Sequence, residues 1–108
     1  MYAVIFEVHP NANGQEEYLA IAASLREKLQ YMEGFISIER FQSLVDEGKL
    51  LSLSFWESEN AIKQWREDIE HHHAQQQGRN RLFNDYRIRV AKVERDYSLN
   101  SREQAPKA

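Results

Sequence analysis

The sequence predicts an α+β fold of the ferredoxin-like β-α-β-β-α-β type. Two segments carry apolar residues at helical spacing, four are rich in β-branched and aromatic residues, and they alternate in this order along 108 residues. A chain of this length buries one core, so we expect one domain. We assign residues 1–97 to that domain. Residues 98–108 are polar, and we expect them to form a disordered tail.

The first half of the chain predicts a strand, a helix and a strand. Residues 2–8 are apolar and β-branched, which indicates a strand, and the turn formers of residues 9–14 indicate a loop. Residues 15–30 predict an amphipathic helix, and we expect Gly34 to end it in a left-handed C-cap. Residues 35–43 alternate as a strand.

The second half predicts a strand, a helix and a strand. Residues 50–56 form a hairpin with the preceding strand around the turn at 46–49. Ser58 is expected to cap a helix over residues 59–73 with a looser continuation to 77, since its hydroxyl accepts an unpaired amide proton. Residues 86–97 indicate a long last strand.

Apolar residues occur on both faces of the predicted sheet. In the first strand Ala3 and Ile5 oppose the set Tyr2, Val4, Phe6 and Val8. Helices on one face leave the other apolar set exposed in a monomer, and a large exposed apolar patch usually marks an interface. We therefore predict a homodimer packed sheet against sheet.

The composition of the chain excludes several classes of function. The net charge is −3 with both signs interspersed, so we expect no nucleic-acid partner. The absence of cysteine excludes disulfides, thiol nucleophiles and cysteine-held metals. No apolar run approaches the roughly 20 residues of a membrane span, and the first residues do not resemble a leader. We expect no membrane partner and a cytoplasmic location.

The chain resembles the antibiotic biosynthesis monooxygenase domain family over residues 2–97. The resemblance rests on Gly34-Phe35 before a strand containing Glu39, on Ser54-Phe55-Trp56-Glu57-Ser58 leading into a helix, and on Trp65, His72 and Gly78-Arg79. It implies a dimeric α/β barrel. The family includes cofactor-independent monooxygenases of quinols or polyketides, haem-degrading enzymes and proteins with no known reaction.

The resemblance also implies a site. Trp65 matches a tryptophan that lines the cavity of active members, and His72 matches a histidine two turns later. The two share a helix face, because they are seven residues apart. We assign them catalytic roles and place Glu39, Trp56 and Arg89 in the substrate pocket. The alternative for Trp65 is a position in the core. The alternative for Glu39 is an ion pair with an arginine of the last strand.

The predicted chemistry is oxidation of a small aromatic or quinol by O₂ without a cofactor. His72 would remove a phenolic proton, which the ordinary pKa of imidazole near ~6.5 suits, and an exposed or hydrogen-bonded His72 is the alternative. We expect no metal, since His71, His72 and His73 point about 100° apart. Haem is disfavoured, because the first strand lacks the expected Asn and Gln75 occupies the ligand position. The alternative function is a non-catalytic small-molecule-binding or stress-response module.

Overall fold

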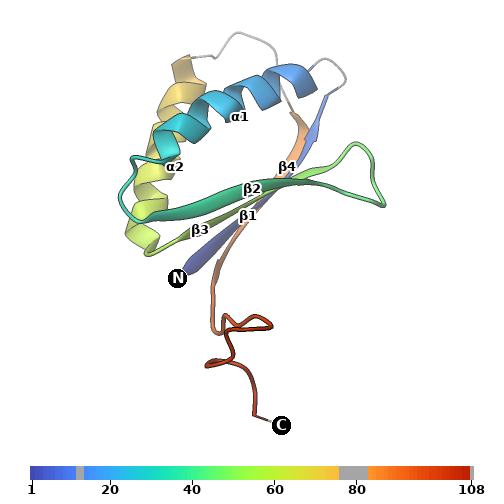
Figure 1. Cartoon of the computed structure of the whole chain (residues 1–108). Helices are drawn as coiled ribbons and strands as arrows, with labels where there is room; N and C mark the ends of the chain where they lie inside the picture. Colours follow the sequence, from blue (N-terminus) through green and yellow to red (C-terminus); the bar gives the residue numbers. More distant parts are fainter. Residues whose placement is uncertain (12–13, 76–82, 108) are drawn as a thin grey trace.

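The computed structural model describes residues 1–11, 14–75 and 83–107, with the side chains of 69–75 and 83–84 outside that description. These residues form four strands and two helices in the predicted order, which confirms the ferredoxin-like α+β class (Figure 1). The elements are β1 (Tyr2–Pro10), α1 (Gln15–Leu29), β2 (Phe35–Gln42), β3 (Leu50–Trp56), α2 (Glu59–Gln75) and β4 (Phe83–Lys92).

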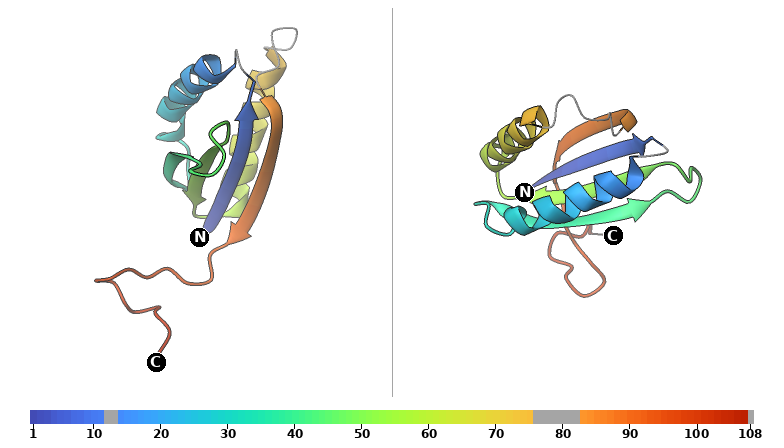
Figure 2. Two further views of the ribbon diagram at one scale, coloured as in Figure 1. Left: turned by 90° about the vertical axis from the view of Figure 1, so that its right-hand side faces the viewer. Right: turned by 90° about the horizontal axis from the view of Figure 1, so that it is seen from above.

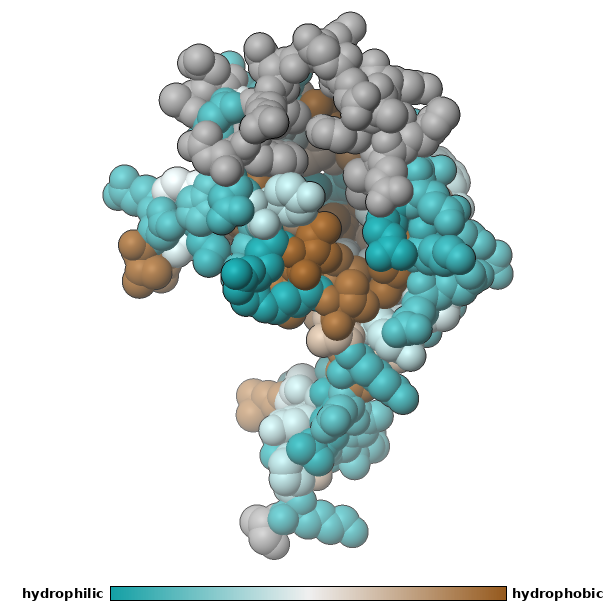
Figure 3. Space-filling model, turned by 180° about the vertical axis from the view of Figure 1, so that it is seen from behind, coloured by the Kyte–Doolittle hydropathy of each residue, from teal (hydrophilic) through white to brown (hydrophobic). Residues whose placement is uncertain are grey.

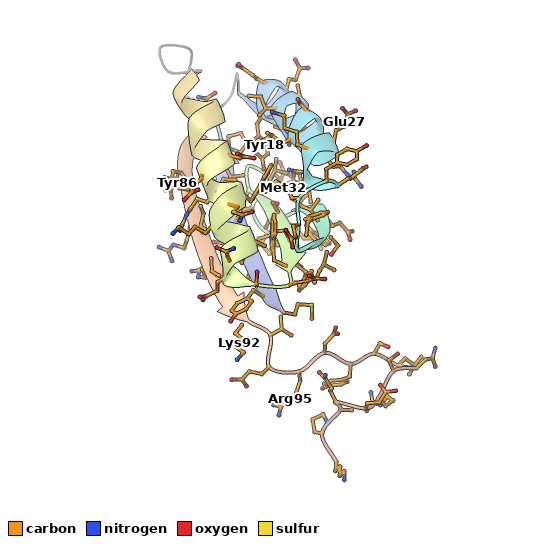
Figure 4. The ribbon with its side chains drawn as sticks, turned by 90° about the vertical axis from the view of Figure 1, so that its left-hand side faces the viewer. Tyr18, Glu27, Met32, Tyr86, Lys92 and Arg95 are labelled. Carbon is orange, nitrogen blue, oxygen red and sulfur yellow. The ribbon has the colours of Figure 1, made fainter. Side chains whose placement is uncertain are left out.

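The strands form one antiparallel sheet in the order β2-β3-β1-β4. Both helices lie on the same face of this sheet, α1 on the β2 side and α2 toward the β4 side (Figures 2 and 4). The sheet therefore has a helix-covered face and an open face. Every side chain of the sheet can be assigned to one of them, because direct cross-strand partners point the same way.

Four rows of side chains point toward the helices, and each row crosses the sheet from β2 to β4. Leu50 and Val8 identify this face, since they pack against Tyr18 of α1. The rows are Gln42, Leu50, Val8 and Tyr86; Arg40, Ser52, Phe6 and Ile88; Ile38, Ser54, Val4 and Val90; and Phe35, Trp56, Tyr2 and Lys92.

The open face carries three rows of the opposite parity. They are Phe41, Leu51, Glu7 and Arg87; Glu39, Leu53, Ile5 and Arg89; and Ser37, Phe55, Ala3 and Ala91. On β3 the alternation places two serines toward the helices and Leu51, Leu53 and Phe55 toward the open side. A strand of a monomeric domain would normally point its apolar set toward the helices.

The core consists of two apolar clusters beneath the helices. One contains the fully buried Trp56 with Leu29 of α1 and Ala61 and Ile62 of α2. The other contains Val8, Leu50 and Tyr18 of α1. In Figure 4 the side chains of Tyr18 and Met32 fill the space between the two helices. The stripe that α1 buries is Tyr18, Ala22 and Leu29, which matches the spacing of an amphipathic helix.

The start of α2 follows the prediction. The amide of Ala61 donates to the hydroxyl of Ser58 over 3.1 Å, so Ser58 is the expected N-cap. The β2–β3 hairpin is also confirmed by its pairing, and its loop is fixed by the amide of Gly48 donating to Asp46 Oδ1 over 3.1 Å.

The predicted C-cap at Gly34 is wrong. Helix α1 ends at Leu29, and its cap residue Gln30 keeps a right-handed helical conformation. Gly34 does have a left-handed backbone, with φ of 82°, but it lies at the entrance to β2. A Cβ there would come within 2.7 Å of the Cβ of Ala61, so glycine allows α2 to pack closely against this turn.

The predicted bounds of the last strand are also wrong. Expected over residues 86–97, β4 runs from Phe83 to Lys92. It pairs with β1, where Lys92 lies opposite Tyr2 and Phe83 opposite Pro10. Among the described residues β1 offers no strand partner beyond Lys92, although the amide of Val93 still donates to Met1 O over 2.9 Å.

The described residues after Val93 lead away from the sheet as a segment with bends and turns but no helix or strand (Figures 1 and 2). The segment contains local hydrogen bonds, among them the amide of Ser98 donating to Ser101 O over 2.8 Å. The guanidinium of Arg102 lies 5.2 Å from the ring centre of Tyr97. Whether residues 98–108 are disordered in solution stays a prediction. In the part of the chain that is described, neither helix has the length and apolar character that crossing a bilayer requires.

Candidate functional site

Trp56 and Trp65 form the centre of the candidate site, on the helix-covered face of the sheet. Trp56 ends β3, and Trp65 lies in the second turn of α2. Their ring centres are 6.3 Å apart with the planes inclined by 31°. The structure thus brings together two of the five residues that the sequence assigned to the site.

Trp56 is held rigidly. It is fully buried, and its indole Nε1 donates to the hydroxyl of Ser54 over 2.9 Å. The ring of Phe35 meets it edge-on with centres 5.3 Å apart. Two aromatic rings pack against Trp56, and its indole N–H has an acceptor, so this side chain is held in one position. Trp65 is only partly buried and lies on the accessible side of this pair.

His72 lies in α2, seven residues after Trp65, and the helix continues to Gln75. Two helical turns therefore separate the backbones of the two residues, as the predicted site requires. The side chain of His72 lies outside the described residues, as do those of its neighbours His71 and His73. Its assignment as the proton acceptor stays a prediction.

Glu39 and Arg89, the other two assigned residues, lie on the open face. They belong to the same row, with Leu53 and Ile5 between them, because β2 and β4 are opposite edges of the sheet. The expected ion pair between Glu39 and an arginine of the last strand is therefore wrong within one chain. Within one chain the sheet also separates both residues from Trp56 and Trp65.

Arg89 pairs instead with Glu7. Its guanidinium lies 3.1 Å from one carboxylate oxygen of Glu7, and Lys49 Nζ lies 3.5 Å from the other. The hydrogen bond from Arg89 is the main reason that the pKa of Glu7 is lowered, and Lys49 adds to it. The open face thus carries a charged cluster of Glu7, Arg89 and Lys49 among apolar rows.

Arg40 was not among the five residues assigned to the site, yet it lies on the same face as the two tryptophans. It is directly opposite Ser52, which is 7% exposed. The Nε of Arg40 is buried and has no hydrogen-bond partner among the described residues. An unpaired buried donor costs roughly 1–3 kcal/mol, and more when the group is charged. The signal in the sequence was the alternation of β2, in which Arg40 has the parity of Ile38.

Exposed apolar residues border the site along β4. Tyr86, Ile88 and Val90 all point toward the helix side, and they are 59%, 51% and 48% exposed. The ring of Tyr86 lies 5.9 Å from that of Phe6. Seen from behind, apolar surface gathers in the middle of the body over this strand (Figure 3). The helix-facing side of β4 is thus partly exposed and apolar.

Among the described residues no three side chains of the types that usually ligate metals come together. The described part of the site is made of aromatic rings, hydroxyls and one guanidinium. Such groups can stack on a flat apolar molecule and hydrogen-bond to an oxygen atom of it.

Comparison with known proteins identifies the family. The family model described as antibiotic biosynthesis monooxygenase matches residues 1–77. The chain belongs to the antibiotic biosynthesis monooxygenase family, as its resemblance implied. It is also 45% identical over 93 residues to the jasmonate monooxygenase ABM of Pyricularia oryzae, a match covering 86% of this chain and 43% of that protein. The chain thus spans less than half the length of this relative.

Solved structures show the same fold at low sequence identity. Rv0793 from Mycobacterium tuberculosis superposes with a TM-score of 0.74 and 18% identity, covering 90% of this chain and 98% of the other. SnoaB from Streptomyces nogalater, described as a cofactor-independent oxygenase, gives 0.70 and 8%, covering 88% and 94%. MhuD with manganese protoporphyrin bound gives 0.70 and 17%, covering 91% and 99%.

Proposed function

We propose that this chain is a monooxygenase that oxidises a small, largely apolar aromatic or quinol with O₂ and without a cofactor. The observation that carries the proposal is the contact of Trp65 with the fixed Trp56, at the edge of an apolar face that is partly exposed along β4. The family and the relative named as a jasmonate monooxygenase support oxygen chemistry. Of the solved structures with this fold, one is named as a cofactor-independent oxygenase and another contains a bound porphyrin.

In this mechanism the protein orients and deprotonates the substrate. The ring of Trp65 holds the flat substrate against the sheet, and His72 takes the proton from its hydroxyl group. The electron-rich anion then reduces O₂. One oxygen atom enters the substrate and the other leaves as water, and the substrate supplies all four electrons, so no external reductant is needed. The pocket keeps water away from the reacting carbon.

The test is oxygen uptake by the purified chain with quinols and polyphenols. We expect uptake that depends on the protein and falls at least about tenfold in His72→Ala and Trp65→Phe, since positioned general bases contribute 10²–10⁴-fold. His71→Ala and His73→Ala are matched controls, because adjacent helical residues point about 100° away. They should retain the activity.

Three results would change the assignment. Unchanged uptake in both His72→Ala and Trp65→Phe rules out these roles. No uptake with any substrate, together with a raised melting temperature on adding one of them, favours a non-catalytic binding module. A haem titration with a visible-band change would restore the haem-degrading alternative.

We also propose that the chain forms a homodimer through the open face of the sheet. Leu51, Leu53 and Phe55 point to this face while serines of β3 point to the helices, which is the reverse of the pattern expected for a monomer. Phe41 on the same face is 41% exposed. In such a dimer Glu39 and Arg89 lie between the two sheets, where they would line a second, closed space.

A further inference from the structure

The helix-covered face of the sheet contains a polar break between its two apolar clusters. Along β3 the residues that face the helices are Leu50 of one cluster, then Ser52 and Ser54, then Trp56 of the other cluster. Both serines are buried, with 7% and 5% exposure. Arg40 of β2 lies directly opposite Ser52 and completes this break.

One of the two serines, Ser54, has a structural role in the core. Ser54 accepts the indole hydrogen of Trp56 over 2.9 Å, so its acceptor is used by the core. No such role accounts for the guanidinium of Arg40. Its Nε is shielded from water and has no hydrogen-bond partner among the described residues. Because a guanidinium stays protonated at every accessible pH, this Nε remains a charged donor that needs a partner.

The described carboxylates nearest in the sheet do not provide that partner. Glu39 is adjacent in sequence but has the opposite parity and points to the open face. Glu7 also points to the open face, where Arg89 and Lys49 already pair with it. The ion pairs of the described residues do not include Arg40. The site thus presents a partly buried guanidinium that, among the described residues, has no hydrogen-bond partner for its Nε and forms no ion pair with a carboxylate.

We propose that Arg40 binds an acidic oxygen of the substrate, so that the substrate is an apolar molecule bearing one carboxylate. The apolar clusters and the Trp65 ring contact its body, Arg40 pairs with the carboxylate, and Ser52 lies beside that pair. Arginine suits this role because its fork of donors matches the two oxygens of a carboxylate. The inference deepens the proposed function and rests on the pocket described for it.

The experiment compares an acid with its ester, which differ in charge but little in shape. Binding of jasmonic acid and methyl jasmonate, and of 2-naphthoic acid and its methyl ester, is measured by calorimetry at pH 7.5. We expect the wild type to bind at least one acid tenfold or more tightly than its ester, which corresponds to about 1.4 kcal/mol. In Arg40→Met the acid should fall to the affinity of the ester, whose own binding stays unchanged.

Two further variants make the result specific. Arg26→Met removes an exposed arginine from the last turn of α1 and should keep the wild-type preference. Arg40→Lys keeps the charge without the fork and should retain part of the preference. If Arg40→Met does not fold, the partial loss in Arg40→Lys decides the matter.

The proposal is overturned if the wild type binds neither acid, if it binds acid and ester equally, or if Arg40→Met keeps the preference. A water molecule as the partner of Arg40 predicts the second of these results. Binding is measured without turnover, so the outcome of this experiment is independent of the oxygen-uptake test of the proposed function. An acid preference that depends on Arg40 in a chain without oxygen uptake supports this inference and contradicts the monooxygenase.

Discussion

Trp65 of α2 contacts Trp56 of β3 with their ring centres 6.3 Å apart, and this contact ties the helix that carries His72 to the sheet. Because only Trp56 is fully buried, the two tryptophans should respond differently to the same substitution. We expect Trp65→Phe to lower the free energy of unfolding by about 1 kcal/mol and Trp56→Phe by about 2–3 kcal/mol. Urea unfolding checks this, and equal losses would contradict the different burial.

Ser54 should contribute more to the free energy of unfolding than Ser52, two residues earlier in β3. Replacing Ser54 with alanine leaves the buried Nε1 of Trp56 without its acceptor, which costs roughly 1–3 kcal/mol. Ser52→Ala is the matched control, of equal volume and similar burial, and we expect a change within about 0.5 kcal/mol.

A double-mutant cycle isolates the hydrogen bond. Ser54→Ala should lose most of its effect in a Trp56→Phe background, because phenylalanine has no donor to leave unpaired. Additive losses in the two backgrounds would show that Ser54 acts through packing alone.

Gly34 should tolerate no side chain. Its φ of 82° is unfavourable for alanine, and the new Cβ would lie 2.7 Å from that of Ala61. We expect Gly34→Ala to destabilise the fold by about 2–3 kcal/mol, from backbone strain of about 1–2 kcal/mol and the clash. Gly48→Ala is the control, since a Cβ there would lie 3.7 Å from Asp46 Oδ1, in ordinary contact. Thermal melts of the two variants should differ, and coincident melts would contradict this account.

The proposed dimer predicts a specific effect of charge on the open face. Light scattering should give the wild type twice the 12.8 kDa mass of the chain. Leu53→Glu places a carboxylate at the centre of the open face and should yield a monomer, because burying an unpaired charge in an interface is unfavourable. Leu44→Glu, at a residue that is 99% exposed, should leave the mass unchanged. A wild-type mass of one chain would refute the dimer.

Much of this architecture could be predicted from the sequence because it depends on local patterns. The apolar spacing of Tyr18, Ala22 and Leu29 defines α1, and the cap at Ser58 defines the start of α2. The end of β4 could not be predicted in this way. It is set by where β1 begins to offer hydrogen bonds, a contact between residues almost the whole chain apart.

The candidate site was predictable only in part for the same reason. Trp56 and Trp65 lie close together in the chain, and the structure brings their ring centres to 6.3 Å from each other. Glu39 and Arg89 were grouped with them by resemblance, although their strand parity puts them on the other face. Arg40 could be recognised as a charge in a strand but not assigned to the site, because the residues around it depend on the register between β2 and β3.

The Glu7 cluster should make stability depend on pH. The pKa of Glu7 is lowered, with the hydrogen bond from Arg89 as the largest cause. A lowered pKa in the folded state means that the stabilisation is present above the unfolded value, 4.5, and is lost as the pH falls through the folded value. Melting temperatures from pH 6 to pH 3 should therefore fall less steeply in Glu7→Gln than in the wild type.

Arg89 and Lys49 both lower the pKa of Glu7, and Arg89 contributes more, so removing each of them in turn gives a matched comparison. Arg89→Met should flatten the pH dependence more than Lys49→Met, since Lys49 lies 3.5 Å from the carboxylate and Arg89 lies 3.1 Å from it. High salt should reduce the effect in the wild type, because all three side chains are partly exposed and salt screens such pairs. A larger effect of Lys49→Met, or a Glu7→Gln slope equal to that of the wild type, would show that the Arg89 hydrogen bond does not control the titration of Glu7.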